Sequence, residues 1–130
     1  MVVFNTENDG LLTVVKDYQE SALRYLWSLD AGIGASSRDV WVNTNVDLMG
    51  KKTISRASII NFLNAMVDEE ILTYHEITGK GGHRRIYAPK YDEEGTKRFW
   101  AKSIIAKMIK EWPEATQSEM KKVTQNGRQK

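Results

Sequence analysis

Residues 51–90 read KKTISRASIINFLNAMVDEEILTYHEITGKGGHRRIYAPK, and this stretch decides the fold. Its first half carries apolar residues at the three- and four-residue spacing of one helical face, from Ile59 to Val67. Thr53 or Ser55 can cap the amino end of that helix, because a hydroxyl there accepts a hydrogen bond from a free backbone N–H. The pattern therefore predicts a helix that ends near Glu69.

The second half of the stretch contains two runs rich in β-branched and aromatic residues, 71–78 and 84–88. Between them, residues 79–83 include three glycines, which adopt the positive φ angles of a tight reversal at little cost. The two runs are therefore predicted to pair as an antiparallel hairpin. Its loop carries Lys80 and His83.

Helical patterns flank this stretch on both sides. The apolar spacing from Val14 to Leu29 predicts a first helix, and a cap at Ser36 or Ser37 begins a short second helix that ends at Gly50. On the carboxyl side, acids at the start and apolar residues further along predict a fourth helix over residues 92–112. The fold class is therefore mostly α with a small antiparallel β-hairpin, an α+β protein with the element order of a winged helix-turn-helix.

The residue types present argue against catalysis and metal binding. The chain has 130 residues and no cysteine, which excludes disulfides, thiolate chemistry and the usual structural zinc sites. His75 and His83 lie in strand and turn segments without the spacing of metal ligands. No nucleophile elbow, phosphate loop or dinucleotide fingerprint occurs. We therefore expect no enzyme activity, no metal and no cofactor.

The distribution of apolar residues also bears on location. No apolar run approaches the roughly 20 residues of a membrane span, and the N-terminus lacks the basic leader and cleavage site of a signal peptide. We expect a single core, no membrane partner and a cytoplasmic location.

The charges are segregated along the chain, although the net charge is only +2. Residues 51–64 contain three basic side chains and no acid, and residues 65–78 contain four acids and no Lys or Arg. Residues 79–90 are again basic and free of acids. A helix and a hairpin that are basic on the same side suit a duplex, with the helix in the major groove and the hairpin, or wing, on the phosphates. Double-stranded DNA is therefore the expected partner.

Individual roles follow from position. Asn61 and Arg56 lie on the polar side of the third helix, where they can pair with adenine and guanine, so they are the predicted specificity residues. Arg84 and Arg85 point to opposite faces of a strand, so one should meet phosphate and the other should pair within the chain. The predicted DNA-binding residues are Lys51, Lys52, Ser55, Arg56, Ser58, Asn61, Asn64, Lys80, His83, Arg84 and Arg85.

The residues that carry this pattern also resemble a known family. In residues 52–63, in Ile71-Leu72 after them, and in the glycine-rich basic wing with residues 86–89, the chain resembles winged-helix regulators of the penicillinase-repressor type, and among them the archaeal-looking members. The resemblance covers about residues 13–112.

The resemblance implies a repressor that binds a palindromic operator as a homodimer. Residues 55–64 and 80–85 would form the DNA-reading elements, and residues 99–112 would join the subunits. Two departures limit it. Acids at residues 68–70 stand where a glycine and basic residues are usual, and no protease-cleavable inducer site is seen, so control of β-lactamase genes does not follow.

The fourth helix has more apolar residues than one core-facing stripe needs, which favours a second copy as its partner. The predicted dimer residues are Phe99, Trp100, Ile104, Ile105, Met108, Ile109 and Trp112. The predicted parts of the chain are a flexible N-terminal arm (1–12), a winged-helix DNA-binding domain (13–90), a C-terminal dimerisation helix (91–112) and a polar, disordered tail (113–130).

Other functions stay open from the sequence alone. The winged helix can serve as a protein-interaction module, which would more often expose an apolar patch. A ligand-sensing regulator of the multiple-antibiotic-resistance type would use Trp27, Trp41 or Trp100 to line a pocket, although core packing is the commoner role of such residues. An RNA binder is less favoured, because no exposed stacking pattern is seen. The sequence does not specify the operator or any effector.

Overall fold

The computed structural model describes residues 2–79 and 82–129. Contacts between residues divide these into two units, residues 3–96 and residues 97–129, with Val2 grouped in the second. The two units are described separately below. Lys80, one of the predicted DNA-binding residues, lies outside the described residues.

Three helices form the helical layer of the first unit: α1 (Asp17–Ser28), α2 (Ser37–Asp47) and α3 (Arg56–Asp68). Their shared core includes Leu23, Val40, Ile59 and Leu63, each with no exposed surface. Burying such a side chain contributes about 1.5–3 kcal/mol, so the apolar spacing seen in the sequence is what orients the three helices. The helices predicted from that spacing are confirmed.

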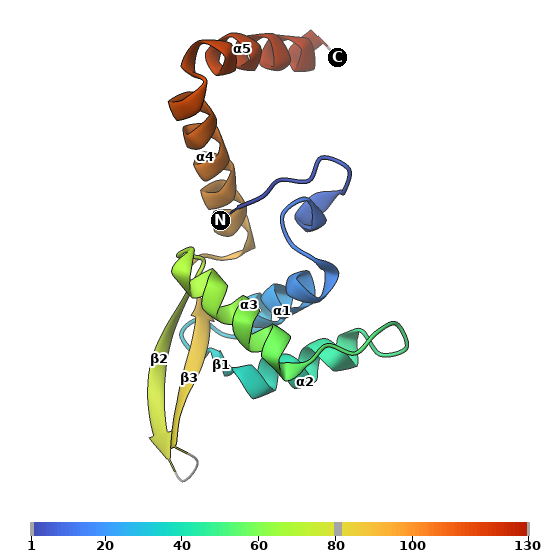
Figure 1. The fold of residues 1–130 in the computed structure, drawn as a ribbon, viewed down its shortest axis with the longest axis vertical. Coiled ribbons are helices and arrows are strands. Elements are labelled where there is room, and N and C mark those ends of the chain that lie inside the picture. The colour runs from blue at the N-terminus through green and yellow to red at the C-terminus, as the bar shows by residue number, and fades with distance from the viewer. Residues whose placement is uncertain (1, 80–81, 130) are drawn as a thin grey trace. The chain divides into compact units, whose positions relative to one another are not determined.

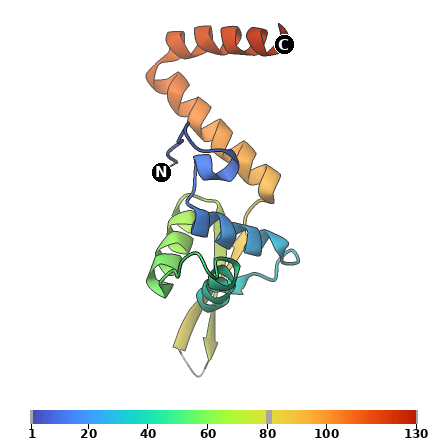
Figure 2. The same cartoon turned by 90° about the vertical axis from the view of Figure 1, so that its right-hand side faces the viewer.

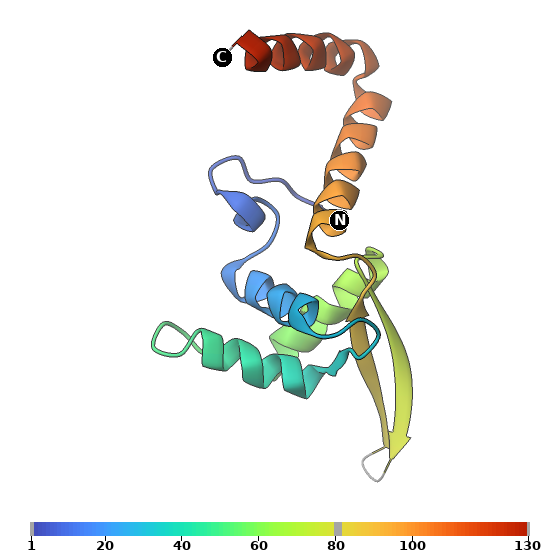
Figure 3. The same ribbon diagram turned by 180° about the vertical axis from the view of Figure 1, so that it is seen from behind.

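A three-stranded antiparallel sheet covers one side of these helices, in the order β1-β3-β2. Strands β2 (Leu72–Gly79) and β3 (Gly82–Pro89) form the predicted hairpin, with Leu72 opposite Pro89 and Gly79 opposite Gly82. The hairpin extends beyond the helices in every view (Figure 1, Figure 2 and Figure 3). The α+β class and the winged-helix arrangement are confirmed.

Strand β1 (Ala35–Ser36) was not predicted, because two residues show no periodicity. It pairs with Tyr87 and Ile86 of β3. Gly34 precedes it at φ 68°, where a Cβ atom would lie 2.6 Å from the Tyr87 carbonyl oxygen. The close approach of β1 to β3 thus requires glycine at this position.

The connection from α2 to α3 is fixed by side chains. Trp41 Nε1 donates a hydrogen bond to the Ile54 backbone carbonyl over 2.8 Å, and Asn45 Oδ1 accepts one from the Ile54 backbone N–H over 2.7 Å. Ser36 Oγ caps α2 by accepting from the Asp39 N–H, at 3.2 Å. These contacts hold the helix-turn-helix in one geometry, and they give Trp41 a structural role.

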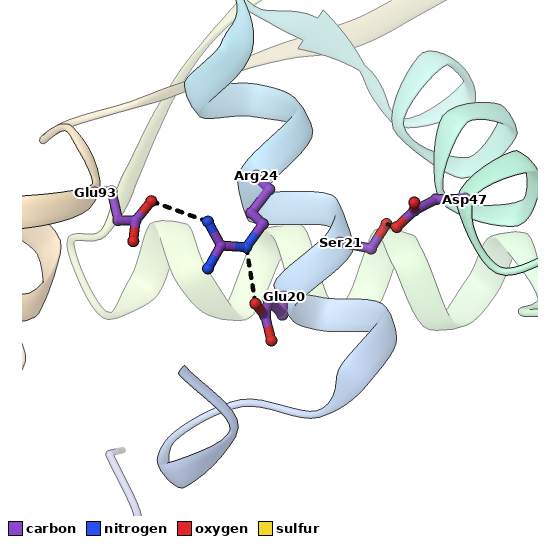
Figure 4. A network of polar contacts seen from close by, with 5 residues as sticks. All are labelled: Glu20, Ser21, Arg24, Asp47 and Glu93. Atoms are coloured by element: carbon purple, nitrogen blue, oxygen red, sulfur yellow. Dashed lines mark hydrogen bonds and ion pairs between the residues drawn. The ribbon is translucent and has the colours of Figure 1, made fainter. Parts of the chain in front are cut away.

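Polar contacts centred on α1 reach its neighbours (Figure 4). Arg24 pairs with Glu20 at 2.8 Å and with Glu93, at the start of α4 (Glu93–Glu111), at 3.0 Å. The hydrogen bond with Glu20 is the main reason that the pKa of Arg24 is raised. On the other side of α1, Ser21 Oγ donates to Asp47 Oδ2 over 2.6 Å, which ties α1 to the end of α2.

The chain ends differ from the sequence prediction. The arm predicted as flexible, residues 1–12, runs into a 3-10 helix, η1 (Gly10–Thr13), in which Leu11 is buried, and the Asn5 N–H donates to the Thr13 carbonyl. The tail predicted as disordered, residues 113–130, forms α5 (Pro113–Gln129).

The low hydrophobicity of residues 113–130 suggested disorder, but other features of this segment favour a helix. Proline is favoured at a first helical position, and most residues after it are good helix formers. Thr116 Oγ1 also donates to the Met108 carbonyl of α4 (Glu93–Glu111) over 3.0 Å. In the described part of the chain, no helix has both the length and the apolar character of a membrane span.

Candidate nucleic-acid interface

The outer face of α3 carries the residues predicted to read bases. Arg56, its first residue, and Asn61 are exposed, whereas Ile59 and Phe62 are buried. Burial of the apolar stripe therefore turns Arg56 and Asn61 outward. Both are exposed, as the sequence predicted.

The serines at the start of α3 bond to each other. Ser55 Oγ accepts from the Ser58 backbone N–H over 3.1 Å and lies 2.9 Å from Ser58 Oγ. Ser55 is exposed and Ser58 is half-buried. Their primary role in this structure is to cap α3, which fixes where its exposed face begins.

The two lysines before α3 are exposed. Lys52 Nζ lies 2.6 Å from Asp17 Oδ2. This hydrogen bond is the main cause of the lowered pKa of Asp17, and Lys51 lowers that pKa further through its charge. Lys52 is thus partly neutralised within the chain, and Lys51 is the more available of the two for an external anion.

Four side chains join the wing to α3. Arg85 Nη1 donates to Asn64 Oδ1 over 3.0 Å, and Tyr87 Oη donates to the same oxygen over 2.6 Å. The Arg85 guanidinium also lies 4.0 Å from the centre of the Tyr74 ring. Burial raises the pKa of Tyr87, which keeps its hydroxyl protonated as a donor.

Because of this cluster, the two wing arginines differ in burial and in hydrogen bonding. Arg85 is half-buried and paired within the chain, whereas Arg84, on the opposite face of β3, is exposed. Asn64 was predicted to contact DNA, but it is half-buried and its amide oxygen already accepts two hydrogen bonds. The geometry gives Asn64 and Arg85 the role of fixing the angle between the wing and α3.

A cleft lies where α2, α3 and the tip of the wing converge. Its volume is about 410 Å³. It is lined by Ser36, Ser37, Arg38, Arg56, Ile77, Thr78, Gly79, Gly82, His83 and Arg84. Four of these residues are basic and none is acidic. The fold thus brings together cations from three separate elements.

Arg38 was missed by sequence reasoning. It is exposed in the first turn of α2, a helix in which no DNA-binding residue was predicted from the sequence. Its proximity to Arg56 and Arg84 arises only from the tertiary fold. A basic residue two positions after the Ser36 cap was the one local signal available.

The predicted dimer residues of α4, with Trp112 directly after it, fall into three groups by exposure. Ile105, Met108 and Trp112 are 40%, 39% and 64% exposed, whereas Trp100 is 3% exposed. The Trp100 side chain is thus almost fully buried, and its place in a dimer interface stays a prediction. The remaining predicted residues, Phe99, Ile104 and Ile109, are half-buried.

Comparison with known proteins bears on the fold alone. No family model matches the chain, and the comparison with curated proteins returns no match. Among solved structures, the chain is similar to the Aeropyrum pernix ORC1 protein in complex with DNA, with a TM-score of 0.54 and 12% sequence identity. The match covers 68% of this chain but only 24% of the ORC1 chain. The likeness supports the winged-helix fold and gives no support for the penicillinase-repressor family in particular.

Proposed function

We propose that this protein binds double-stranded DNA in a sequence-specific manner and regulates transcription. The observation that carries the proposal is the exposed polar face of α3, with Arg56 and Asn61, beside a wing whose exposed arginine is Arg84. A major groove about 12 Å wide admits such a helix, and the wing then meets the flanking backbone. The fold likeness to a protein solved in complex with DNA agrees with this role.

The partner of α4 in this proposal is a second copy of the chain. Ala101, Ile105, Met108 and Trp112 are exposed and recur at alternating four- and three-residue steps, the a and d spacing of a coiled coil. Two copies packed along this seam bury it about a two-fold axis, so the homodimer binds a palindromic site. A repressor that occludes a promoter is the form of regulation that the family resemblance implies.

Selection of bound sequences from random duplex DNA tests the function. We expect one enriched palindromic motif, and we expect Asn61→Ala to lower affinity for that motif by about 1–3 kcal/mol with nonspecific affinity nearly unchanged. Asn43→Ala, on the exposed side of α2, is the matched control. Failure to enrich any motif contradicts the proposal.

A second candidate function, a protein-interaction module, has one specific observation in its favour. Val42, Val46 and Met49 follow one face of α2 and its end, and they are 45%, 59% and 75% exposed. An apolar surface of this kind suits a protein partner better than a phosphate backbone. Loss of partner capture on Val46→Lys, with DNA binding absent in the parent, would favour this candidate.

A further inference from the structure

The cleft between α2, α3 and the wing presents cations that the fold itself does not neutralise. Arg38, Arg56 and Arg84 are exposed side chains that line it. Within residues 2–79 and 82–129, no ion pair joins any of the three to a carboxylate. Like charges that face one cavity repel each other, and an anion placed among them removes that repulsion. The cleft therefore favours an anionic occupant.

The shape and donors of the cleft indicate which anion fits. Its volume of about 410 Å³ falls within the roughly 300–1,000 Å³ of ligand sites, so it has room for a phosphate group. Guanidinium groups donate in a planar fork that matches phosphate oxygens, and His83 adds a ring nitrogen. The amino end of α2, with Ser37 in the lining, contributes the positive end of a helix dipole.

We infer that this cleft binds one phosphate group of the DNA backbone, held jointly by Arg38, Arg56 and Arg84. The inference rests on the proposed function and refines it in two ways. Arg38 becomes a DNA-binding residue, and Arg56 becomes a phosphate contact instead of the base reader that the sequence suggested. Asn61 is then the reader on α3. A phosphate clamped between α3 and the wing also fixes the depth to which α3 enters the groove.

The salt dependence of duplex binding tests this assignment. Each phosphate that a protein neutralises contributes about 0.9 to the slope of log affinity against log salt. The variants are Arg38→Gln, Arg84→Gln and the double replacement, each measured on a short duplex of random sequence. Because all three arginines share one phosphate, each single replacement lowers the slope, and the double replacement lowers it by about 0.9 in total.

The expected result can be stated as a fold-change. Between about 50 and about 200 mM salt, the parent loses about 3.5-fold more affinity than the double variant, which is the fourfold salt change raised to the power 0.9. Arg38→Lys retains the charge and keeps most of the slope. Lys107→Ala removes one positive charge from α4 and leaves the slope of the parent. Arg38 and Arg84 are exposed, so their replacement should cost little stability. Thermal unfolding checks that every variant is folded.

Two results overturn the inference: a double variant with the parent's slope, or one whose slope falls by the roughly 1.8 of two independent phosphates. Failure of the proposed function looks different, because the parent itself then shows no salt-dependent affinity for duplex DNA. A third outcome would show that the cleft assignment alone is wrong. In that outcome the parent binds duplex DNA and Asn61→Ala loses specificity, but Arg38→Gln keeps the parent's salt slope.

Discussion

The two neighbouring arginines of the wing are expected to behave in opposite ways when each is replaced with alanine. Arg85→Ala removes a hydrogen bond from a charged donor to Asn64, worth about 1.5–3 kcal/mol, and a cation–π contact with Tyr74, worth about 0.5–1 kcal/mol. Arg85 is only half-buried, so solvent screens part of both, and the lower ends apply. The sum is a loss of about 2 kcal/mol.

Thermal unfolding followed by circular dichroism measures this loss. At about 4–8 °C per kcal/mol for a domain of this size, Tm should fall by roughly 8–16 °C in Arg85→Ala. Arg84→Ala should leave the free energy of unfolding within about 0.5 kcal/mol, because that side chain is exposed and makes no hydrogen bond or ion pair in the described part of the chain.

The salt dependence of DNA binding should change in Arg84→Ala and not in Arg85→Ala, the reverse of the effect on stability. Arg84→Ala should lower the salt slope by no more than about 0.9, while Arg85→Ala, measured well below its Tm, should keep the parent's slope. The reasoning is refuted if Arg84→Ala is the destabilised variant, or if Arg85→Ala retains the parent's Tm and loses salt dependence.

Three further predictions concern the fold that holds this interface. Thr44 is fully buried and its hydroxyl has no hydrogen-bond partner among the described residues, so Thr44→Val should stabilise by about 1 kcal/mol; a lower Tm would show that the hydroxyl is bonded in solution. Glu70 directly follows the carboxyl-terminal cap of α3, Glu69, and has φ 65°, so Glu70→Gly should stabilise by about 0.5–1 kcal/mol, with Glu70→Ala as the control that should not. The lowered pKa of Asp17 means that its pairing with Lys52 stabilises the fold above the usual carboxyl pKa and is lost as pH falls through the lowered folded value. Lys52→Gln should therefore raise the pKa of Asp17, followed by NMR, and reduce the loss of Tm on acidification; an unchanged pKa would contradict the pairing.

The sequence predicts those parts of the molecule that local patterns control. Helix α3 and the hairpin follow from the spacing of Ile59, Phe62 and Leu63 and from the glycines of the turn, because burial and backbone freedom act on neighbouring residues. Helix α5 was missed because its sparse apolar residues suggested disorder, although its residues favour helix.

In the candidate site, too, local patterns predict some features and tertiary packing determines the others. The exposure of Arg56 and Asn61 follows from the helical period, so it could be predicted. The contact of Arg85 with Asn64, 21 residues away, and the convergence of Arg38 with the wing depend on tertiary packing. No local pattern carries that information, which is why Asn64 was assigned to DNA and Arg38 was not.

The most direct test of the account is a map of backbone amide shifts by NMR while the selected duplex is added to the whole protein. The account predicts that the largest changes fall on the first half of α3, from Arg56 to Asn61, on the first turn of α2 around Arg38, and on β3 around Arg84. It predicts little change on the outer face of α2 from Val42 to Met49. Changes concentrated on that apolar face, with α3 and the wing unaffected, would contradict the claim that α3 reads DNA.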